Sequence, residues 1–381
     1  MTNATDSIVL PSHLLPSDGR FGSGPSKVRP EAAQALAARA HDYLGTSHRQ
    51  ATVRDVVGRA RDGLAQMFSL PDGYEVLLGN GGSTAFWDAA SFGLVERKSQ
   101  HVVIGEFSSK CAGVMKAAPH LDAPDVIETA PGEAPAPNHA DPTIDTYCFP
   151  HNETSTGVMC NVIRPAGADG LVMVDATSGA GGLRVDPSQF DVYYFAPQKC
   201  FAGDGGLWLA LVSPAAVERI ERITTTKRWV PASLDLATAL EQSRLNQTYN
   251  TPALATVFML AHQVEWMNSN GGLDWCVQRC DESSAAIYDW ADQHKLAQPF
   301  VTESARSHVT ATIDFDDSID ALILAKVLRR NGILDVDSYR KLGRNQLRVA
   351  LFPAIEPSDI TILTRAIDFV LEQLAGLTGT S

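Results

Sequence analysis

Apolar and polar positions follow two periods along the first two thirds of the chain. Apolar runs typical of strands, each leading into small or polar residues, occupy 74–80, 101–107, 145–157 and 170–182. Apolar residues at helical spacing occupy 30–44, 53–68 and 84–95. Strands that alternate with helices predict an α/β domain with a mainly parallel sheet, and such sheets bind ligands where their strands end.

The stretch from 190 to 212 predicts two strands joined by a glycine-rich loop. Val192–Phe195 is an aromatic and β-branched run that Pro197 ends, and Leu207–Val212 is a second apolar run. Lys199 then lies at a strand end beside aromatic and small residues. Burial there disfavours the charged form, lowers the pKa and leaves a nucleophilic amine. A surface lysine in a hairpin loop explains this stretch equally well.

The pattern changes near residue 272. The remainder predicts an α+β arrangement, with helices at 273–294, 319–332 and 358–377 and strands at 307–315 and 345–352. We therefore expect a large domain at 23–272 and a small C-terminal domain at 273–381. The N-terminal segment 1–22 is expected to pack with the small domain.

Composition narrows the class of protein. The chain has 381 residues, which is long for a single hydrophobic core. Its 44% hydrophobic and 20% charged residues are typical of a soluble globular protein. A net charge of −13 argues against a general binder of nucleic acid or of anionic membranes. An anionic substrate must therefore be held by a few local arginines.

The sequence carries no targeting or metal-binding signal. No apolar run approaches the roughly 20 residues that span a bilayer, and the proline-broken N-terminus lacks the basic region of a signal peptide. The six cysteines form neither a CxxC pair nor a Cys/His zinc pattern. We expect a cytoplasmic protein with reduced thiols and no metal site.

An acid and a lysine follow two neighbouring predicted strands. Asp175 ends the first of these strands and Lys199 follows the second. Pyridoxal phosphate needs a lysine for its Schiff base and an acid that faces its pyridinium nitrogen, and this pair supplies both. A carboxylate that merely caps a helix is the alternative interpretation of Asp175.

Other candidate groups also lie just after strands. Gly81–Thr84 could bind a phosphate through helix N-terminal amides and two hydroxyls, although a plain helix start has the same residues. Phe107 ends a predicted strand, where it could stack on a flat ring or belong to the core. Thr154 could donate a hydrogen bond to a ring hydroxyl or serve as a turn residue.

Six short motifs together point to a known family. They are GSGP (22–25), SHR (47–49), NET (152–154), VDATS (174–178), PQK (197–199) and NTP (250–252). In this order, over nearly the whole chain, they resemble the phosphoserine aminotransferases of the actinobacterial type. These are class-V, fold-type I enzymes that use pyridoxal 5′-phosphate. The resemblance implies a large domain with a mainly parallel, seven-stranded sheet flanked by helices, and a small α+β C-terminal domain.

The resemblance also implies roles for individual residues. Lys199 would form the Schiff base and then carry the substrate's proton, Asp175 would face the pyridine nitrogen, and Phe107 would stack on the ring. Thr154 would bond the ring oxygen. The cofactor phosphate would be held by Ser83, Thr84 and Gln198, joined by Asn250 and Thr251 of a second subunit. The resemblance therefore implies a homodimer with shared sites.

The implied reaction transfers the amino group of L-glutamate to 3-phosphohydroxypyruvate and gives O-phospho-L-serine and 2-oxoglutarate. The resemblance extends to the related four-carbon step of vitamin B6 synthesis. Both substrates carry two anionic ends, so the site needs two cationic poles. Arg348 would bind the α-carboxylate in a forked geometry. The far end would be met by His48, Arg49 and Arg340.

This chain departs from the family pattern at several positions. Phe107 stands where many relatives have tryptophan, and Ser83-Thr84 stands where many have glycine-arginine. Tyr339 replaces a frequent histidine, and two extra residues separate Arg340 from Arg348. Lys27 could add charge at the mouth of the site.

Three other functions compete with this interpretation. Another class-V aminotransferase, such as an alanine–glyoxylate enzyme, would need no arginine at the far pole. A non-catalytic phosphate-binding module would use Gly81–Thr84 alone and would be colourless. A cysteine desulfurase would need a reactive cysteine on a mobile loop, and none of the six cysteines is marked for that role.

Overall fold

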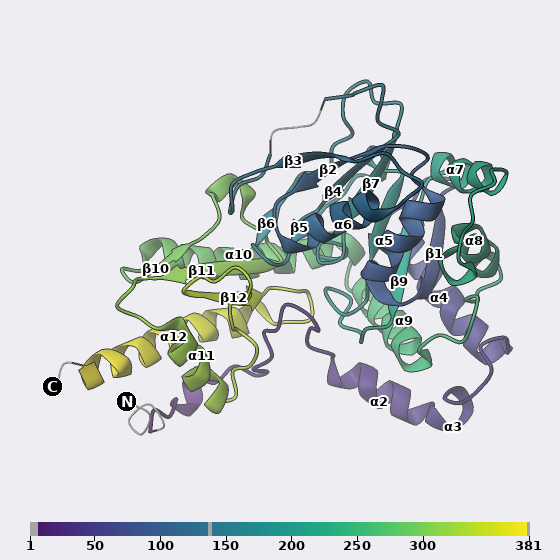
Figure 1. Cartoon of the computed structure of the whole chain (residues 1–381). Helices are drawn as coiled ribbons and strands as arrows, with labels where there is room; N and C mark the ends of the chain where they lie inside the picture. The colour runs from purple at the N-terminus through teal and green to yellow at the C-terminus, as the bar shows by residue number, and fades with distance from the viewer. Residues whose placement is uncertain (1–6, 136–138, 379–381) are drawn as a thin grey trace.

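The computed structural model describes residues 7–135 and 139–378, and its largest feature is a seven-stranded sheet (Figure 1). In spatial order the strands are β1 (Glu75–Asn80), β9 (Leu207–Val212), β8 (Val192–Phe195), β7 (Leu171–Asp175), β4 (Thr146–Pro150), β2 (Ser99–Val103) and β3 (Asp125–Glu128). Within the described residues, β9 alone runs antiparallel to its neighbours in this sheet. The prediction of a mainly parallel, seven-stranded α/β sheet is confirmed.

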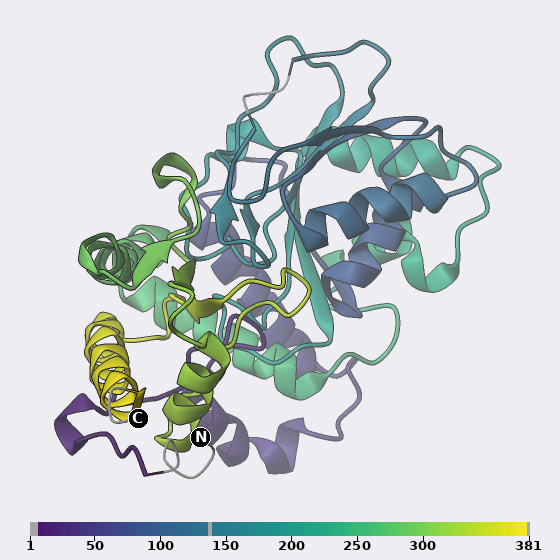
Figure 2. The same ribbon diagram turned by 60° about the vertical axis from the view of Figure 1, so that its left-hand side comes forward.

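Helices cover both faces of the sheet because its strands are apolar on both sides. In β1, Val76 and Leu78 point to one face and Leu77 to the other, and β7, β8 and β9 alternate likewise. The first face packs against α4 (Ala51–Met67) and α9 (Leu254–Ser269). The second face packs against α5 (Gly82–Gly93), α6 (Glu106–Ala117), α7 (Pro214–Thr224) and α8 (Leu236–Arg244), as Figures 1 and 2 show.

A second, smaller sheet lies toward the C-terminal end of the chain. It is antiparallel, in the order β10 (Ala297–Pro299), β11 (Thr310–Phe315) and β12 (Gln346–Ala350). Its helices are α10 (Gly272–Gln293), α11 (Ala321–Arg330) and α12 (Pro357–Thr378).

The N-terminal segment runs beside α11 and α12 (Figures 1 and 2). Ile8, Leu10 and Phe21 belong to the same apolar cluster as the small sheet, and Asn331 bonds the backbone of Ile8 and Leu10. Residues 1–6 of the expected N-terminal segment lie outside the described residues. The domain division at residues 22 and 272 stays a prediction.

Two parts of the chain differ from the expected elements. The helix expected at 30–44 is interrupted at Arg39 and forms α2 (Pro30–Ala38) and α3 (Ala40–Tyr43). Residues 213–271, for which the pattern predicted no element, contain α7, α8 and α9. α9 has no single apolar stripe because it lies against the sheet on one side and contacts α2, α4 and α10 elsewhere.

Several short elements complete the fold. They are η1 (Ser12–Leu14), β5 (Asn152–Glu153), β6 (Val158–Met159), η2 (Pro187–Gln189), η3 (Ala232–Leu234) and η4 (Glu303–Ala305). All six cysteines are free thiols. In the part of the chain that the structure describes, no cluster of His, Cys, Asp and Glu could hold a metal ion, and no helix is long and apolar enough to cross a membrane.

Candidate active site

A cavity of about 390 Å³ lies where β4, β7 and β8 end. The parallel strands bring their carboxyl ends to one edge of the sheet, and the residues that follow each strand therefore face the same space. Seven residues predicted to bind a cofactor line this cavity: Ser83, Thr84, Phe107, Thr154, Asp175, Gln198 and Lys199.

Lys199 lies in the turn after β8 and is held by the segment that contains the GSGP motif. Its Nζ donates to the Ser23 carbonyl, while Ser26 Oγ donates to the Lys199 carbonyl at 2.6 Å. A Cβ on Gly24 would lie 2.1 Å from Nζ, and the φ of 135° at Gly24 is one that residues with a side chain rarely adopt, so glycine suits this position. The lysine is therefore held both by the turn after β8 and by residues 23–26.

Burial lowers the pKa of Lys199 to about 8, and the nearby positive charge of Arg348 acts in the same direction. A substantial fraction of this amine is therefore neutral near pH 8. A surface lysine in a hairpin loop, the alternative explanation of this stretch, does not describe this environment.

Asp175 ends β7, and hydrogen-bond donors surround its carboxylate. Oδ1 accepts from the Thr177 amide at 2.9 Å and from the Thr177 hydroxyl at 2.5 Å, and Oδ2 accepts from Trp87 Nε1 at 3.2 Å. Burial raises the pKa of Asp175, and hydrogen bonds from Thr177, Tyr194 and Trp87 oppose that rise. The carboxylate is thus buried but well supplied with donors.

The turn before α5 forms another wall of the cavity. Gly81 has a positive φ of 111° and no side chain caps the helix, so the first amides of α5 lie beside the cavity lining without a side-chain partner. Ser83 and Thr84 lie in the first turn, and the Ser83 hydroxyl lies 2.7 Å from Thr177 Oγ1, to which it donates because the Thr177 proton goes to Asp175. Amides and hydroxyls in this arrangement suit a phosphate group.

Phe107 lies on a helix rather than at a strand end, so that expectation was wrong. β2 ends at Val103, and the chain turns into α6 at Glu106. The reason is a distant contact: the carboxylate of Glu153 accepts the Phe107 amide at 3.1 Å and thereby supports the helix start. The ring still lines the cavity.

Thr154, Asn152 and Ser178 form a small hydrogen-bonded network in the cavity wall. Thr154 Oγ1 and Asn152 Nδ2 each lie 2.8 Å from Ser178 Oγ. The Thr154 carbonyl accepts from Arg348 Nη1 at 3.2 Å, which links this network to the predicted carboxylate-binding arginine.

Arg348 lies on β12 and is partly buried. Burial lowers its pKa, and its Nε has no hydrogen-bond partner among the described residues. Its guanidinium lies 5.3 Å from the centre of the Tyr339 ring, which in turn lies 5.8 Å from the Phe107 ring. Arg340 is exposed on the same loop. Lys27 pairs with Asp18 at 3.5 Å.

Four predicted site residues gather elsewhere. Thr251 Oγ1 lies 3.2 Å from His48 Nδ1, and Arg49 Nη1 donates to Gln247 at 2.7 Å. Asn250 contacts the side chain of Asn80 at the end of β1. Among the residues that the structure describes, these four do not belong to the cavity lining of their own chain. In the part of the chain that the structure describes, Arg340 and Arg348 are likewise absent from the cavity lining.

The cavity also contains residues that the sequence reasoning missed. Trp87, Glu153 and Ser178 all line it. Glu153 and Ser178 fall within the NET and VDATS motifs, which could have drawn attention to them. Nothing in the local pattern marks Trp87, because its role depends on α5 facing the end of β7.

The residues present fit pyridoxal phosphate. Three buried atoms around the lysine, Ser23 Oγ, Asn152 Oδ1 and Gln198 Oε1, have no hydrogen-bond partner among the described residues. Buried polar atoms are normally paired, so these atoms suit a polar ligand. A buried acid, a weakly basic lysine and a helix start provide what the ring, the aldehyde and the phosphate of this cofactor need.

Comparison with known proteins identifies the family. The family model for class-V aminotransferases matches residues 21–336. A phosphoserine aminotransferase of Nocardioides is 58% identical over 374 residues, which cover 97% of this chain and 100% of the relative. One from Corynebacterium glutamicum is 58% identical over 370 residues, which cover 97% of this chain and 98% of the relative.

Solved structures agree with this assignment. A phosphoserine aminotransferase of Cytophaga hutchinsonii has a TM-score of 0.86 at 25% identity, covering 92% of this chain and 99% of that one. A ureidoglycine–glyoxylate aminotransferase of Bacillus subtilis shares the fold with a TM-score of 0.77 at 17% identity, covering 96% and 95%. The fold is thus common to enzymes with different substrates. Its sequence and its fold together place this chain in the class-V aminotransferase family, among the phosphoserine aminotransferases.

Proposed function

We propose that this enzyme transfers the amino group of L-glutamate to 3-phosphohydroxypyruvate, with pyridoxal 5′-phosphate as cofactor. The products are O-phospho-L-serine and 2-oxoglutarate. The observation that carries the proposal is 58% identity to phosphoserine aminotransferases over 97% of this chain. The grouping of a lysine, an acid and a helix start in one cavity supports it.

The cofactor, when bound, supplies an aldehyde for the amines and a ring that withdraws electrons from the substrate Cα. Asp175 would hold the proton on the ring nitrogen, and Phe107 would stack on the ring. Thr154 would bond the ring oxygen. The phosphate would be bound by the α5 start with Ser83, Thr84 and Gln198.

Lys199 would act first as the nucleophile that holds the cofactor and then as the base that moves the proton at the substrate Cα. Both tasks need a neutral amine, and burial lowers its pKa to about 8. The Ser23 carbonyl, which accepts from Nζ, would receive the amine when it is not bonded elsewhere.

Arg348 would bind the α-carboxylate that both substrates share. It is partly buried, and its positive charge lies close enough to Lys199 to lower the pKa of that amine. Its Nε has no partner among the described residues and is available for a carboxylate. Arg340 lies on the loop next to Tyr339 and would reach the distal anionic group of the substrate.

We propose that His48, Arg49, Asn250 and Thr251 complete the site of a second subunit. These residues form one cluster because His48 contacts Thr251. Large apolar side chains are exposed in the adjoining segments, with Leu44 at 40%, Leu245 at 46% and Tyr249 at 50%. A second copy that covers these segments would bury that apolar area, which supports the proposed dimer.

A reducing, cytoplasmic location is part of the proposal, and all six cysteines being free thiols supports it. The four-carbon phosphorylated substrate of vitamin B6 synthesis has the same two anionic ends. It is therefore a second substrate to assay at the same site.

Half-reactions test the substrate class. Glutamate and O-phosphoserine should each abolish the visible absorption band of the bound cofactor, whereas alanine should leave it nearly unchanged. Lys199→Ala should respond to none of the three. An enzyme for which alanine is the best donor would contradict the two-pole argument and favour an alanine–glyoxylate type.

A further inference from the structure

Glu153 is a buried acid that the reaction above does not use. It is 0% exposed and lies between Asn152 and Thr154 at the wall of the cavity. No ion pair joins Glu153 to a lysine or arginine among the described residues. A buried carboxylate without a paired cation is costly, so its surroundings must compensate by hydrogen bonding.

That compensation comes from the start of α6. Glu153 Oε2 accepts from the Phe107 amide at 3.1 Å and from the Ser108 amide and hydroxyl at 2.9 Å each. These are the second and third residues of α6, whose N-cap residue, Gly105, provides no capping side chain. Glu153, on β5, thus caps the N-terminus of α6, a position where a negative charge is favoured.

The other carboxylate oxygen, Oε1, also accepts hydrogen bonds from the protein. Glu153 Oε1 accepts from the Ser155 amide at 3.2 Å and from its hydroxyl at 2.7 Å, and Ser155 Oγ accepts the Glu106 amide at 3.0 Å. A Cβ on Gly105 would lie 2.5 Å from Glu153 Cγ, so glycine leaves the space that the acid fills.

This arrangement needs glutamate rather than glutamine. Each of the two oxygens faces at least one backbone N–H, which cannot turn away or become an acceptor. A glutamine would place its NH₂ group against one of these amides, whichever way it was turned. The acid is therefore not replaceable by its neutral isostere.

We propose that Glu153 is a positioning residue that holds the first turn of α6, and with it the Phe107 ring, against the cofactor. The same turn bears Glu106, which pairs with Lys341 on the loop of Tyr339. Glu153 thereby also fixes the turn of α6 that contacts the loop of Tyr339 and Lys341. This inference rests on the proposed cofactor site.

Hydrogen exchange measured by mass spectrometry tests the cap directly, in both cofactor-loaded and cofactor-free protein. Glu153→Gln should speed exchange of the amides at 105–110. The matched control is Asp145→Asn, since Asp145 is also an acid that accepts backbone amides, those of 96–98, but at the other end of the sheet. It should speed exchange at 96–98 and leave 105–110 unchanged.

Cofactor binding tests the consequence for the ring. Glu153→Gln should raise the dissociation constant for pyridoxal phosphate by about tenfold, and Asp145→Asn should change it less than twofold. Phe107→Ala should weaken binding with normal exchange at 105–110. If Glu153 acts through the ring, the double variant will bind no more weakly than Phe107→Ala alone.

Two results would overturn the proposal. One is unchanged exchange at 105–110 in Glu153→Gln; the other is additive losses in the double variant, which would mean that Glu153 acts through its charge on Lys199 and Arg348. Should Glu153→Gln not fold, Ser155→Ala must speed exchange at 105–110, and its failure to do so would count equally against the cap. Wild-type protein that does not bind pyridoxal phosphate would refute the proposed function, while the exchange data would still judge the cap.

Discussion

Lys199 combines two environments that oppose its charge. It is enclosed by the turn after β8 and by the segment at 23–26, and Arg348 adds a second positive charge nearby. A charged amine is therefore disfavoured, although the Ser23 carbonyl still gives Nζ a partner. The lysine is held ready as a nucleophile before any ligand binds.

This environment predicts a pH profile. Because the neutral amine reacts, capture of pyridoxal phosphate by cofactor-free enzyme should speed up as pH rises and level off above the pKa of about 8. Stopped-flow absorbance between pH 6 and 10 would locate the midpoint. Arg348→Gln should move the midpoint upward, yet keep it below the 10.5 of a free lysine, because burial is the larger cause.

A midpoint near that of a free lysine in the wild type would contradict the burial argument. Arg306→Gln is a suitable control, since Arg306 pairs with Asp292 away from the cavity. Its midpoint should stay at the wild-type value.

Lys199 and Asp175 were predictable because each follows an apolar run that must be a buried strand. Parallel strands then bring such residues to one edge without any knowledge of the rest of the fold. Phe107 and Trp87 differ. Phe107 lies on a helix that Glu153 caps from far along the chain, and Trp87 reaches Asp175 only through packing of α5 on the sheet.

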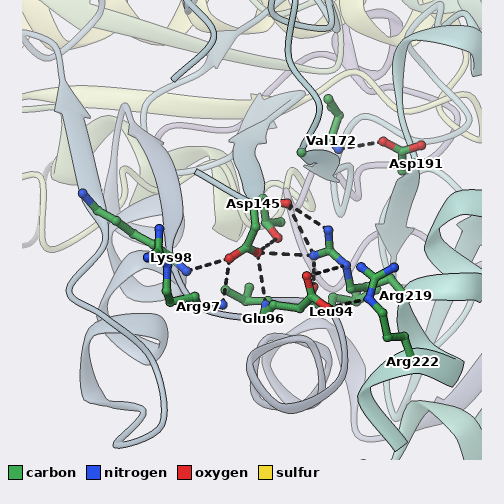
Figure 3. Close-up of polar contacts among 12 residues, drawn as sticks. Leu94, Glu96, Arg97, Lys98, Asp145, Val172, Asp191, Arg219 and Arg222 are labelled. Atoms are coloured by element: carbon green, nitrogen blue, oxygen red, sulfur yellow. Dashed lines mark hydrogen bonds and ion pairs between the residues drawn. The ribbon is translucent and has the colours of Figure 1, made fainter. Parts of the chain in front are cut away.

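At the scale of elements, an acid network joins three segments at the amino ends of β2 and β4 (Figure 3). These are the strand ends opposite the cavity. Asp145, just before β4, accepts the amides of Glu96, Arg97 and Lys98 at 2.7–3.1 Å. It also pairs with Arg219 of α7 at 3.3 Å. The network fixes the turn into β2 and docks α7 on it.

Asp145→Asn should lower the free energy of unfolding by about 2–3 kcal/mol, because an NH₂ group would then face amide donors or a guanidinium. Denaturant unfolding followed by circular dichroism would measure the loss. Cofactor affinity should stay within twofold of the wild type, since the network is remote from the cavity. A loss of stability below about 0.5 kcal/mol would show that water replaces these bonds.

The elements themselves were predictable to differing degrees. β8 and β9 follow the expected runs because strands buried on both faces are continuously apolar. α9 gave no readable stripe, since it is apolar on nearly every side. The break at Arg39 has no equivalent in the helical spacing of 30–44.

At the scale of the whole molecule, we propose a site that draws on two chains. Lys199 lies in the cavity, while Arg49 and Thr251 lie in the cluster assigned to the partner's site. This division could not be predicted from periodicity, because no pattern within one chain encodes which surface meets a second copy. Only the resemblance to a family supplied it.

Mixed dimers provide the test. Lys199→Ala and Arg49→Ala should each be nearly inactive alone, whereas co-expression should restore up to about a quarter of wild-type activity, since half of random dimers have one intact site of two. Transaminase assays on the co-purified mixture would show it. Two tags would confirm that both chains are present. A mixture as inactive as its parents would place both residues in the same chain's site.

The attachment of the N-terminal segment has a consequence for synthesis on the ribosome. Phe21 bonds the backbone at Leu334 and Ala350, and the carbonyl of Ser23, two residues further on, receives Lys199. Those two partners emerge from the exit tunnel more than 100 residues after the sheet that carries Lys199 is complete. Domains fold largely in the order in which they emerge. Residues 21–23 are therefore placed against Lys199 last. A nascent chain acquires the cofactor-binding environment of this lysine only near the end of translation.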